Sequence, residues 1–156
     1  MYKHILVAVD GSDTATLALR EAIKLAKGQR AELRLIHVVN ATLLGWDEST
    51  AMEAAAMLLE TLKKEGRTIA DRAISQVRKA GLEAQVVLPE TFGERVASVI
   101  VEEARRWPAD LIVLGTHGRR GVDRLLLGSV AEGVVRLSAK PVLLVHGTQR
   151  KERKKT

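Results

Sequence analysis

The stretch LGTHGRRGVDRLLLGSV, residues 114–130, ends a run of four apolar residues and leads into a segment of helical spacing. It predicts a strand, a glycine-rich loop and a helix, in that order. Gly115, Gly118 and Gly128 are spaced G-x2-G-x9-G, and Ser129 follows the last glycine directly. Glycine lets backbone N–H groups come close to a ligand, and a helix start offers unpaired N–H donors with a partial positive charge. This combination suits a chain of phosphate groups.

A second interpretation of the same stretch needs no ligand. The glycines would then serve only the turns between strand and helix, and Ser129 with Glu132 would form a capping box at the helix start. The stretch alone leaves both interpretations open.

Outside it, apolar runs typical of strands alternate with segments of helical spacing, which is the pattern of a parallel sheet covered on both faces. The sequence predicts five strands, at residues 5–9, 31–39, 82–88, 111–114 and 141–145. It predicts four helices between them. They are expected from about residue 15 to 28, from 50 to about 80, before Pro108 with a buried face at 96–104, and from 129 to about 138.

The predicted helix ends carry residues that normally start or stop a helix. Capping boxes are expected to open the second and third helices, and glycines to close the first two. These residues are Thr50 with Glu53, Thr91 with Glu94, Gly28 and Gly81. Gly66 lies inside the second helix, which is about 30 residues long, and is expected to kink or loosen it.

Crossovers between parallel strands are right-handed, so the strand order remains to be predicted. The first and fourth strands are apolar at nearly every position, which favours the middle of the sheet. The order 3-2-1-4-5 makes them neighbours, and ligands bind outside the carboxyl ends of the strands at such a switch point. Asp10, able to bind ribose hydroxyls, would face the N–H groups at Gly115. The expected fold is a single-domain, open α/β fold of the Rossmann-like type, with a parallel five-stranded sheet and four helices on two faces.

Composition restricts the class of protein further. The 156 residues suit one domain, and with only 3% aromatic residues the core must be aliphatic. The absence of cysteine excludes disulfides and thiolate metal sites. The apolar run at residues 5–9 is too short for a signal peptide or a membrane span, so we expect a cytoplasmic protein without a membrane partner.

The net charge of +6 is concentrated at the C-terminal end, where residues 150–155 carry five basic side chains and one acidic one, a net +4. We therefore predict a domain at residues 1–147 and a basic, disordered tail at residues 148–156. Because the remaining chain has little excess positive charge, nucleic-acid binding is not expected.

Three motifs occur together: VDGS at residues 9–12, HV at residues 37–38, and the G-x2-G-x9-G spacing followed by Ser129. With them the chain resembles the nucleotide-binding branch of the universal stress protein family, over nearly all of residues 1–147. The resemblance implies that Asp10 binds ribose, that the backbone of Val38 faces adenine, and that the glycine motif surrounds the phosphates. The implied site residues are Ala8, Val9, Asp10, Val38, Gly115, Thr116, His117, Gly118, Arg119, Gly128, Ser129 and Val130.

His117 lies inside the loop, and Arg119 and Arg120 follow Gly118. These side chains would either help to hold phosphate charge or simply face solvent. The other histidines lie at strand ends without metal-ligand spacing, so they are interpreted as structural and no metal site is expected. They are His4, His37 and His146.

The resemblance implies an ATP-binding stress-response regulator or scaffold with little or no turnover. AMP or ADP are alternative ligands, and Mg²⁺ would be held through the nucleotide phosphates. The chain has no G-x4-G-K-[ST] loop and no G-x-G-x-x-G after the first strand, and no catalytic residue is predicted. Two alternatives stay open, a dimeric scaffold without nucleotide and a slow ATPase.

The segment Val142–Val145 would form an edge strand in the predicted order, yet it is apolar at four successive positions. An exposed edge of this kind favours pairing with another chain. We therefore expect a homodimer through this strand, which the resemblance also implies, although the tail could cover it instead. The loops at residues 40–49, with Trp46, and at 119–127 are expected to move with the nucleotide, and a protein partner is expected but not identified.

Overall fold

The computed structural model describes residues 1–42, 50–117 and 127–147. Five parallel strands form the main sheet in the order β4-β2-β1-β6-β7. Counted along the chain within this sheet, that is the predicted order 3-2-1-4-5, so the predicted fold is confirmed. The strands are β1 (His4–Ala8), β2 (Glu32–Ile36), β4 (Ala84–Val87), β6 (Leu111–Gly115) and β7 (Val142–Val145).

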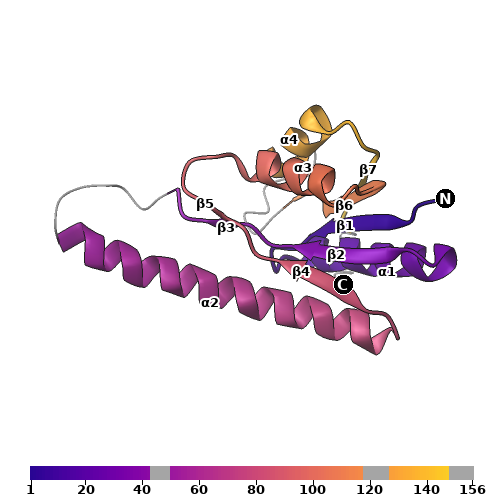
Figure 1. Ribbon diagram of the computed structural model, residues 1–156, viewed down its shortest axis with the longest axis horizontal. Helices are drawn as coiled ribbons and strands as arrows, with labels where there is room; N and C mark the ends of the chain where they lie inside the picture. The colour runs from indigo at the N-terminus through magenta and orange to yellow at the C-terminus, as the bar shows by residue number, and fades with distance from the viewer. Residues whose placement is uncertain (43–49, 118–126, 148–156) are drawn as a thin grey trace, which may run out of the picture.

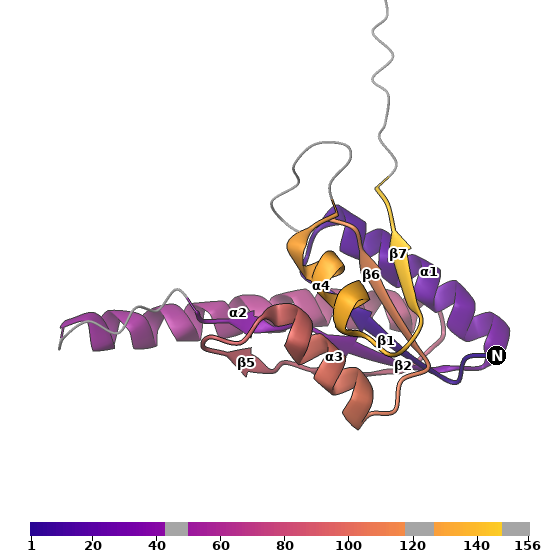
Figure 2. The same ribbon diagram turned by 90° about the horizontal axis from the view of Figure 1, so that it is seen from above.

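Two helices cover each face of the sheet, as Figure 1 shows and the turned view of Figure 2 repeats. One face carries α1 (Asp13–Gln29) and α2 (Thr50–Lys79), and the other carries α3 (Val96–Arg106) and α4 (Ser129–Leu137). The four predicted helices are therefore present, and α2 runs past the end of the sheet (Figure 1).

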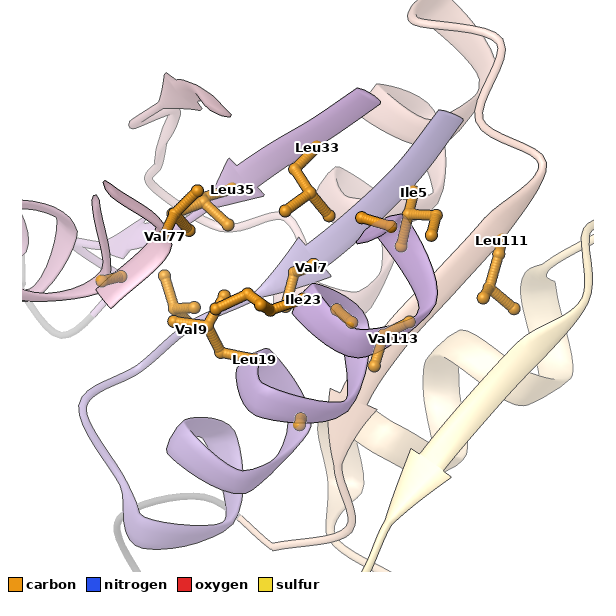
Figure 3. Packing of buried hydrophobic residues seen from close by; sticks show 14 of the residues in the cluster. Ile5, Val7, Val9, Leu19, Ile23, Leu33, Leu35, Val77, Leu111 and Val113 are labelled. Carbon is orange, nitrogen blue, oxygen red and sulfur yellow. The ribbon is translucent and has the colours of Figure 1, made fainter. Parts of the chain in front are cut away.

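The core divides into two aliphatic clusters because successive strand residues point to opposite faces. Ile5 and Val7 of β1 lie on the α1 side of the sheet, in one cluster with Leu19 and Ile23 (Figure 3). Leu6, between them, packs in the second cluster with Ile100 of α3. Alternation on a strand that is buried on both faces explains why β1 reads as a continuous apolar run.

The predicted second strand was too long. β2 ends at Ile36, and the chain then forms β3 (Val39–Asn40), which pairs with β5 (Glu90–Thr91) in a separate two-stranded parallel sheet. The Val39 N–H donates to the carbonyl of Pro89 at 2.8 Å, and Pro89 itself has no N–H to donate. The small sheet thus continues the β2–β4 pairing beyond the proline, and it was not predicted.

Two predicted helix signals were wrong, one at the end of α1 and one at the start of α3. Gly28 lies inside α1, and Arg30 ends the helix with a left-handed φ of 55°, its N–H donating to the Ala26 carbonyl. Thr91 belongs to β5 and donates its hydroxyl to the Glu94 carbonyl at 2.9 Å, so Arg95 takes the N-cap position of α3 without a side-chain cap. Each signal works only at the residue where the helix actually ends or begins. In the folded chain α1 continues past Gly28, and Thr91 lies in β5 rather than directly before α3.

The capping box at Ser129 and Glu132 was also wrong, because Ser129 is the first helical residue of α4 and Gly128 takes the N-cap position. The box predicted at Thr50 and Glu53 cannot be compared, since the residue before α2 lies outside the described residues. The predicted end of α2 is confirmed at Gly81, whose φ is 76°.

Gly66 does not interrupt α2, which is one helix from Thr50 to Lys79. Instead it lies where α2 packs against the residues that follow β2. A Cβ atom at this position would lie 2.9 Å from Cδ2 of His37 and 3.3 Å from Cγ2 of Val39. The glycine therefore serves the close approach of two elements.

Within residues 1–42, 50–117 and 127–147, no helix is both long and apolar enough to cross a membrane. The predicted tail, residues 148–156, lies outside these ranges.

Candidate functional site

The acidic turn after β1 lies at the carboxyl edge of the main sheet. Gly11 has a φ of 82°, and the tight turn it permits brings the Ser12 N–H to 2.9 Å from Oδ1 of Asp10. Asp10 is half-buried. The side chain predicted to bind ribose is thus held in place by a backbone donor two residues further on.

Ser12 is the N-cap residue of α1. Its hydroxyl accepts from the Ala15 N–H at 3.1 Å, and its carbonyl accepts from the Thr16 hydroxyl at 3.1 Å. The side-chain cap satisfies one of the first N–H groups of α1, so that group is not available to an anion.

Gly115, the last residue of β6, faces the first turn of α1. A Cβ atom at this position would lie 2.7 Å from the Thr14 hydroxyl and 2.8 Å from both the carbonyl carbon and the Cβ of Thr14. No ordinary side chain fits into such a contact. The first glycine of the motif therefore has a packing reason, and its predicted contact with a nucleotide stays a prediction.

Thr116 and His117 form the start of the glycine loop. Thr116 is fully buried, and its carbonyl accepts from the Gly128 N–H at 2.8 Å, which ties the two ends of the loop together. Its hydroxyl hydrogen-bonds with Nδ1 of His117 at 3.0 Å. The Thr14 hydroxyl donates to the His117 carbonyl. The loop base is thus held by hydrogen bonds from the start of α1 and from the residue before α4, and by one between Thr116 and His117.

One interpretation of the sequence was that His117 simply faces solvent. The structure does not support it. The residue is half-buried, and its Nε2 atom is buried with no hydrogen-bond partner among residues 1–42, 50–117 and 127–147. Buried polar atoms usually find a partner in protein or water, so this nitrogen is available to a polar group that enters the site.

The N-terminus of α4 differs from that of α1. Gly128, at its N-cap, is extended (φ −61°, ψ 150°) and has no side chain to cap the helix. Ser129 and Val130, in the first turn, are exposed. The first N–H groups of a helix have no partner inside it and carry partial positive charge. Each helix has one acidic residue in its first turn, Asp13 in α1 and Glu132 in α4, so the missing side-chain cap is what leaves this end of α4 more open to an anion.

The end of β2 completes the edge beside β1. The Val9 N–H donates to the Ile36 carbonyl at 2.9 Å, and Nδ1 of His37 donates to the Val9 carbonyl at 2.8 Å. His37 therefore has the structural role predicted for it. Val38 and Ala8 are half-buried and pack against the cluster on the α3 side.

A chain of hydrogen bonds brings the two predicted halves of the site together. Asp10 connects through Ser12 and Thr14 to His117, and Thr116 connects to Gly128. Ser12 and Thr14 were missed by the sequence analysis, because a hydroxyl in a helix start is first interpreted as a cap. Gly118, Arg119, Arg120 and Trp46, with most of the two loops expected to move, lie outside the described residues.

Asp110 lies at the opposite, amino edge of the main sheet, directly before β6. Its Oδ2 accepts from the backbone N–H groups of Lys3 at 2.7 Å and His4 at 2.9 Å. These two hydrogen bonds lower the pKa of the Asp110 carboxyl, because they stabilise its charged form. In the described part of the chain, no group of three or more His, Asp or Glu side chains gathers in a way that could hold a metal ion.

Sequence comparison identifies relatives along almost the whole chain. A family model described as the Universal stress protein family matches residues 1–146. The chain is 40% identical over 147 residues to universal stress protein MJ0531 of Methanocaldococcus jannaschii, across 93% of this chain and 82% of that protein. It is 34% identical over 150 residues to universal stress protein YxiE of Bacillus subtilis, across 93% and 99% of the two chains.

Solved structures share the fold. The hypothetical protein MJ0577 superposes with a TM-score of 0.83 at 28% identity, over 96% of this chain and 99% of that one. A universal stress protein in complex with cAMP gives 0.68 at 25% identity, over 94% and 99%. The universal stress protein from Archaeoglobus fulgidus in complex with dAMP gives 0.65 at 28% identity, over 92% and 98%.

Proposed function

Because this chain belongs to the universal stress protein family, we propose that it binds ATP at the carboxyl edge of β1 and β6 and acts as a nucleotide-dependent stress-response regulator or scaffold. Two structural relatives were solved with the adenine nucleotides cAMP and dAMP, which supports an adenine nucleotide as the ligand class. ATP is proposed because the resemblance places the glycine motif in the ATP-binding branch of the family, and AMP and ADP stay alternatives.

The observation that carries the proposal is the open N-terminus of α4. The exposed first turn, with Ser129 and Val130, offers backbone N–H groups and a hydroxyl to phosphate oxygens. The N-terminus of α1 lies beside the same loop base, but because Ser12 caps it, it offers fewer free N–H donors to a phosphate. Phosphate charge is therefore expected at α4.

The remaining residues take roles around this anchor. Asp10, oriented by the Ser12 N–H, accepts from ribose hydroxyls, and the backbone of Val38 faces adenine, with Ala8 and Val9 beside it. Nε2 of His117 supplies a polar contact from the loop base. Gly118 and Arg119 are proposed to complete the phosphate contacts, and any Mg²⁺ would be held through phosphate oxygens.

Little or no turnover is proposed, because the side chains around the loop base are used in holding it. The hydroxyls of Thr14 and Thr116 and Nδ1 of His117 bond to one another or to backbone. ATP hydrolysis needs a positioned base or an activated water, whereas these side-chain atoms are engaged in holding the loop base.

A charge reversal at the start of α4 tests the nucleotide proposal. In Ser129→Glu, a carboxylate in the first turn favours the helix but repels phosphates, so calorimetric titration should show ATP binding about tenfold weaker or worse. Ser129→Gln is the neutral control of similar size and should lose less. Failure of the wild-type chain to bind ATP with Mg²⁺ would leave the nucleotide-free scaffold, and phosphate release at a steady rate would favour the slow ATPase.

The homodimer is proposed through β7, which ends the main sheet and has a neighbour only on the β6 side among the described strands. Beside it, α4 exposes Val135 (47%) and Leu137 (50%), which extends the apolar edge onto a helix. Sedimentation should show a dimer that Leu137→Glu weakens. Met57→Glu, at a 69% exposed apolar side chain of α2, is the control and should leave the dimer intact.

Nucleotide is proposed to change the dimer contacts or the choice of a protein partner, which requires ATP to bind two states with different affinity. The partner and the cytoplasmic location stay predictions from sequence.

A further inference from the structure

Thr14 lies where two strand ends meet the first turn of α1. It is the second residue of α1 and is half-buried. Its hydroxyl and main chain face Gly115 at the end of β6, where a Cβ atom would lie within 2.8 Å of them. Its methyl group lies 3.1 Å from the Cβ position of Gly147, just after β7. Glycine at both strand ends leaves the room that Thr14 occupies.

The hydroxyl of Thr14 makes the contact that matters for the loop. It donates to the carbonyl of His117, the last described residue before residues 118–126, and lies 3.3 Å from the Ser12 hydroxyl. The next carbonyl back, that of Thr116, accepts the Gly128 N–H, directly before α4. Consecutive carbonyls are thus fixed from α1 on one side and from the start of α4 on the other.

We infer that Thr14 is a positioning residue, whose hydroxyl fixes the base of the glycine loop and thereby sets the N-terminus of α4 for its ligand. The inference rests on the proposed function for its ligand, ATP. Thr14 touches no nucleotide in this account. It acts through the His117 carbonyl and the Thr116–Gly128 hydrogen bond.

The two ends of the threonine side chain can be tested separately. Thr14→Val keeps the methyl contact with Gly147 and removes the hydroxyl. Thr14→Ser keeps the hydroxyl and removes the methyl. Thr16→Val is the matched control, because it removes a hydroxyl in the same turn of α1 that donates only to the Ser12 carbonyl.

Titration with ATP and Mg²⁺ is the first measurement. Thr14→Val should bind about tenfold more weakly, because the His117 carbonyl loses its donor and the loop base its fixed geometry. Thr14→Ser and Thr16→Val should stay within about twofold of the wild type. Equal binding by Thr14→Val and the wild type would overturn the inference, as would an equal loss in Thr14→Ser, since the hydroxyl would then not be the cause.

Hydrogen exchange of the Gly128 amide in the nucleotide-free protein is the second measurement. This amide donates to the Thr116 carbonyl, so it should exchange faster in Thr14→Val and at the wild-type rate in Thr14→Ser. Unchanged exchange in Thr14→Val would overturn the positioning role. If the wild type binds no ATP, the proposed function fails on that result, and the Gly128 amide still decides the role of Thr14.

Discussion

At the carboxyl edge of the main sheet the chain is held by glycines, hydroxyls and backbone groups, whereas at the amino edge charged and aromatic side chains hold it. Gly115 and Thr14 interlock at the first edge, and Asp110 binds the N–H groups of Lys3 and His4 at the second. Small groups allow close packing of the main chain at the first edge, while large side chains fill the opposite edge. The two ends of the same strands are thus held by different kinds of contact, close packing around glycine at one end and hydrogen bonds and ion pairs of larger side chains at the other.

The amino-edge cluster extends from Asp110 across the α3 face of the sheet. The ring of His4 packs edge-on against Trp107 with centroids 5.2 Å apart, and the guanidinium of Arg34 lies 4.7 Å from the centre of the Trp107 ring. Arg34 also pairs with Glu103, Nη1 to Oε1, at 2.6 Å, and their side chains are only 19% and 15% exposed. This cluster joins β1, β2 and α3.

The largest expected effect is at the carboxyl edge. Gly115→Ala puts a methyl group 2.8 Å from the backbone of Thr14, which cannot move away as a flexible side chain could. We expect a loss of about 2–3 kcal/mol in the free energy of unfolding, from overpacking. Urea denaturation measures it. Gly93→Ala, where nothing lies within 4 Å, is the control, and an equally small effect at both positions would contradict the interlocking of α1 and β6.

A smaller loss is expected at the amino edge from Arg34→Met, which keeps apolar contact with Trp107 but leaves the mostly buried Glu103 without its cation. We expect a loss of about 1.5–2 kcal/mol. Adding Glu103→Gln should recover part of it, because the unpaired charge is removed. If a double-mutant cycle in urea shows no coupling, the pair adds nothing to stability. ATP binding should be unchanged in both variants, which separates the two edges.

Two helix glycines give effects of opposite sign. Gly28→Ala in α1 meets nothing within 4 Å and should stabilise the chain by about 0.5–1 kcal/mol through helix propensity. Gly66→Ala in α2 has the same propensity gain but places a methyl group 2.9 Å from Cδ2 of His37, so we expect a net loss of about 1 kcal/mol. Thermal unfolding of the two variants compares them directly. Stabilisation by Gly66→Ala would show that His37 moves aside freely.

The smallest effect at neutral pH is expected from Asp110→Asn, since an amide oxygen still accepts from the N–H groups of Lys3 and His4. The difference should emerge in acid. Because the folded pKa of Asp110 is lowered, its contribution to stability is present above the unfolded pKa of about 3.9 and is lost as pH falls through the folded pKa.

Unfolding curves from pH 7 to pH 2.5 measure this acid dependence. The wild type should lose more stability below about pH 4 than Asp110→Asn does. Parallel curves for the two proteins would mean that the carboxyl of Asp110 titrates equally in the folded and unfolded chain.

The main sheet could be predicted from the sequence because its central strands are buried on both faces. Leu6 and Val7 in β1, and Ile112 and Val113 in β6, are 0% exposed, so both strands read as continuous apolar runs and fall in the middle. The position of Asp10 and of the glycine motif at the carboxyl edge follows from that order. The helix ends were predicted less well, since Thr91 and Ser129 fit a capping pattern without capping a helix.

The order of amino acids determined the five strands, the four helices, their arrangement and the edge at which the candidate site lies. All of these depend on periodicity and turn residues that act over a few neighbouring positions. Only the tertiary structure decided what each glycine is for and which hydroxyl holds the loop. Thr14 and His117 are 103 positions apart in the sequence. Their contact is set by how closely α1 packs on the ends of β6 and β7, a distance that no local pattern encodes.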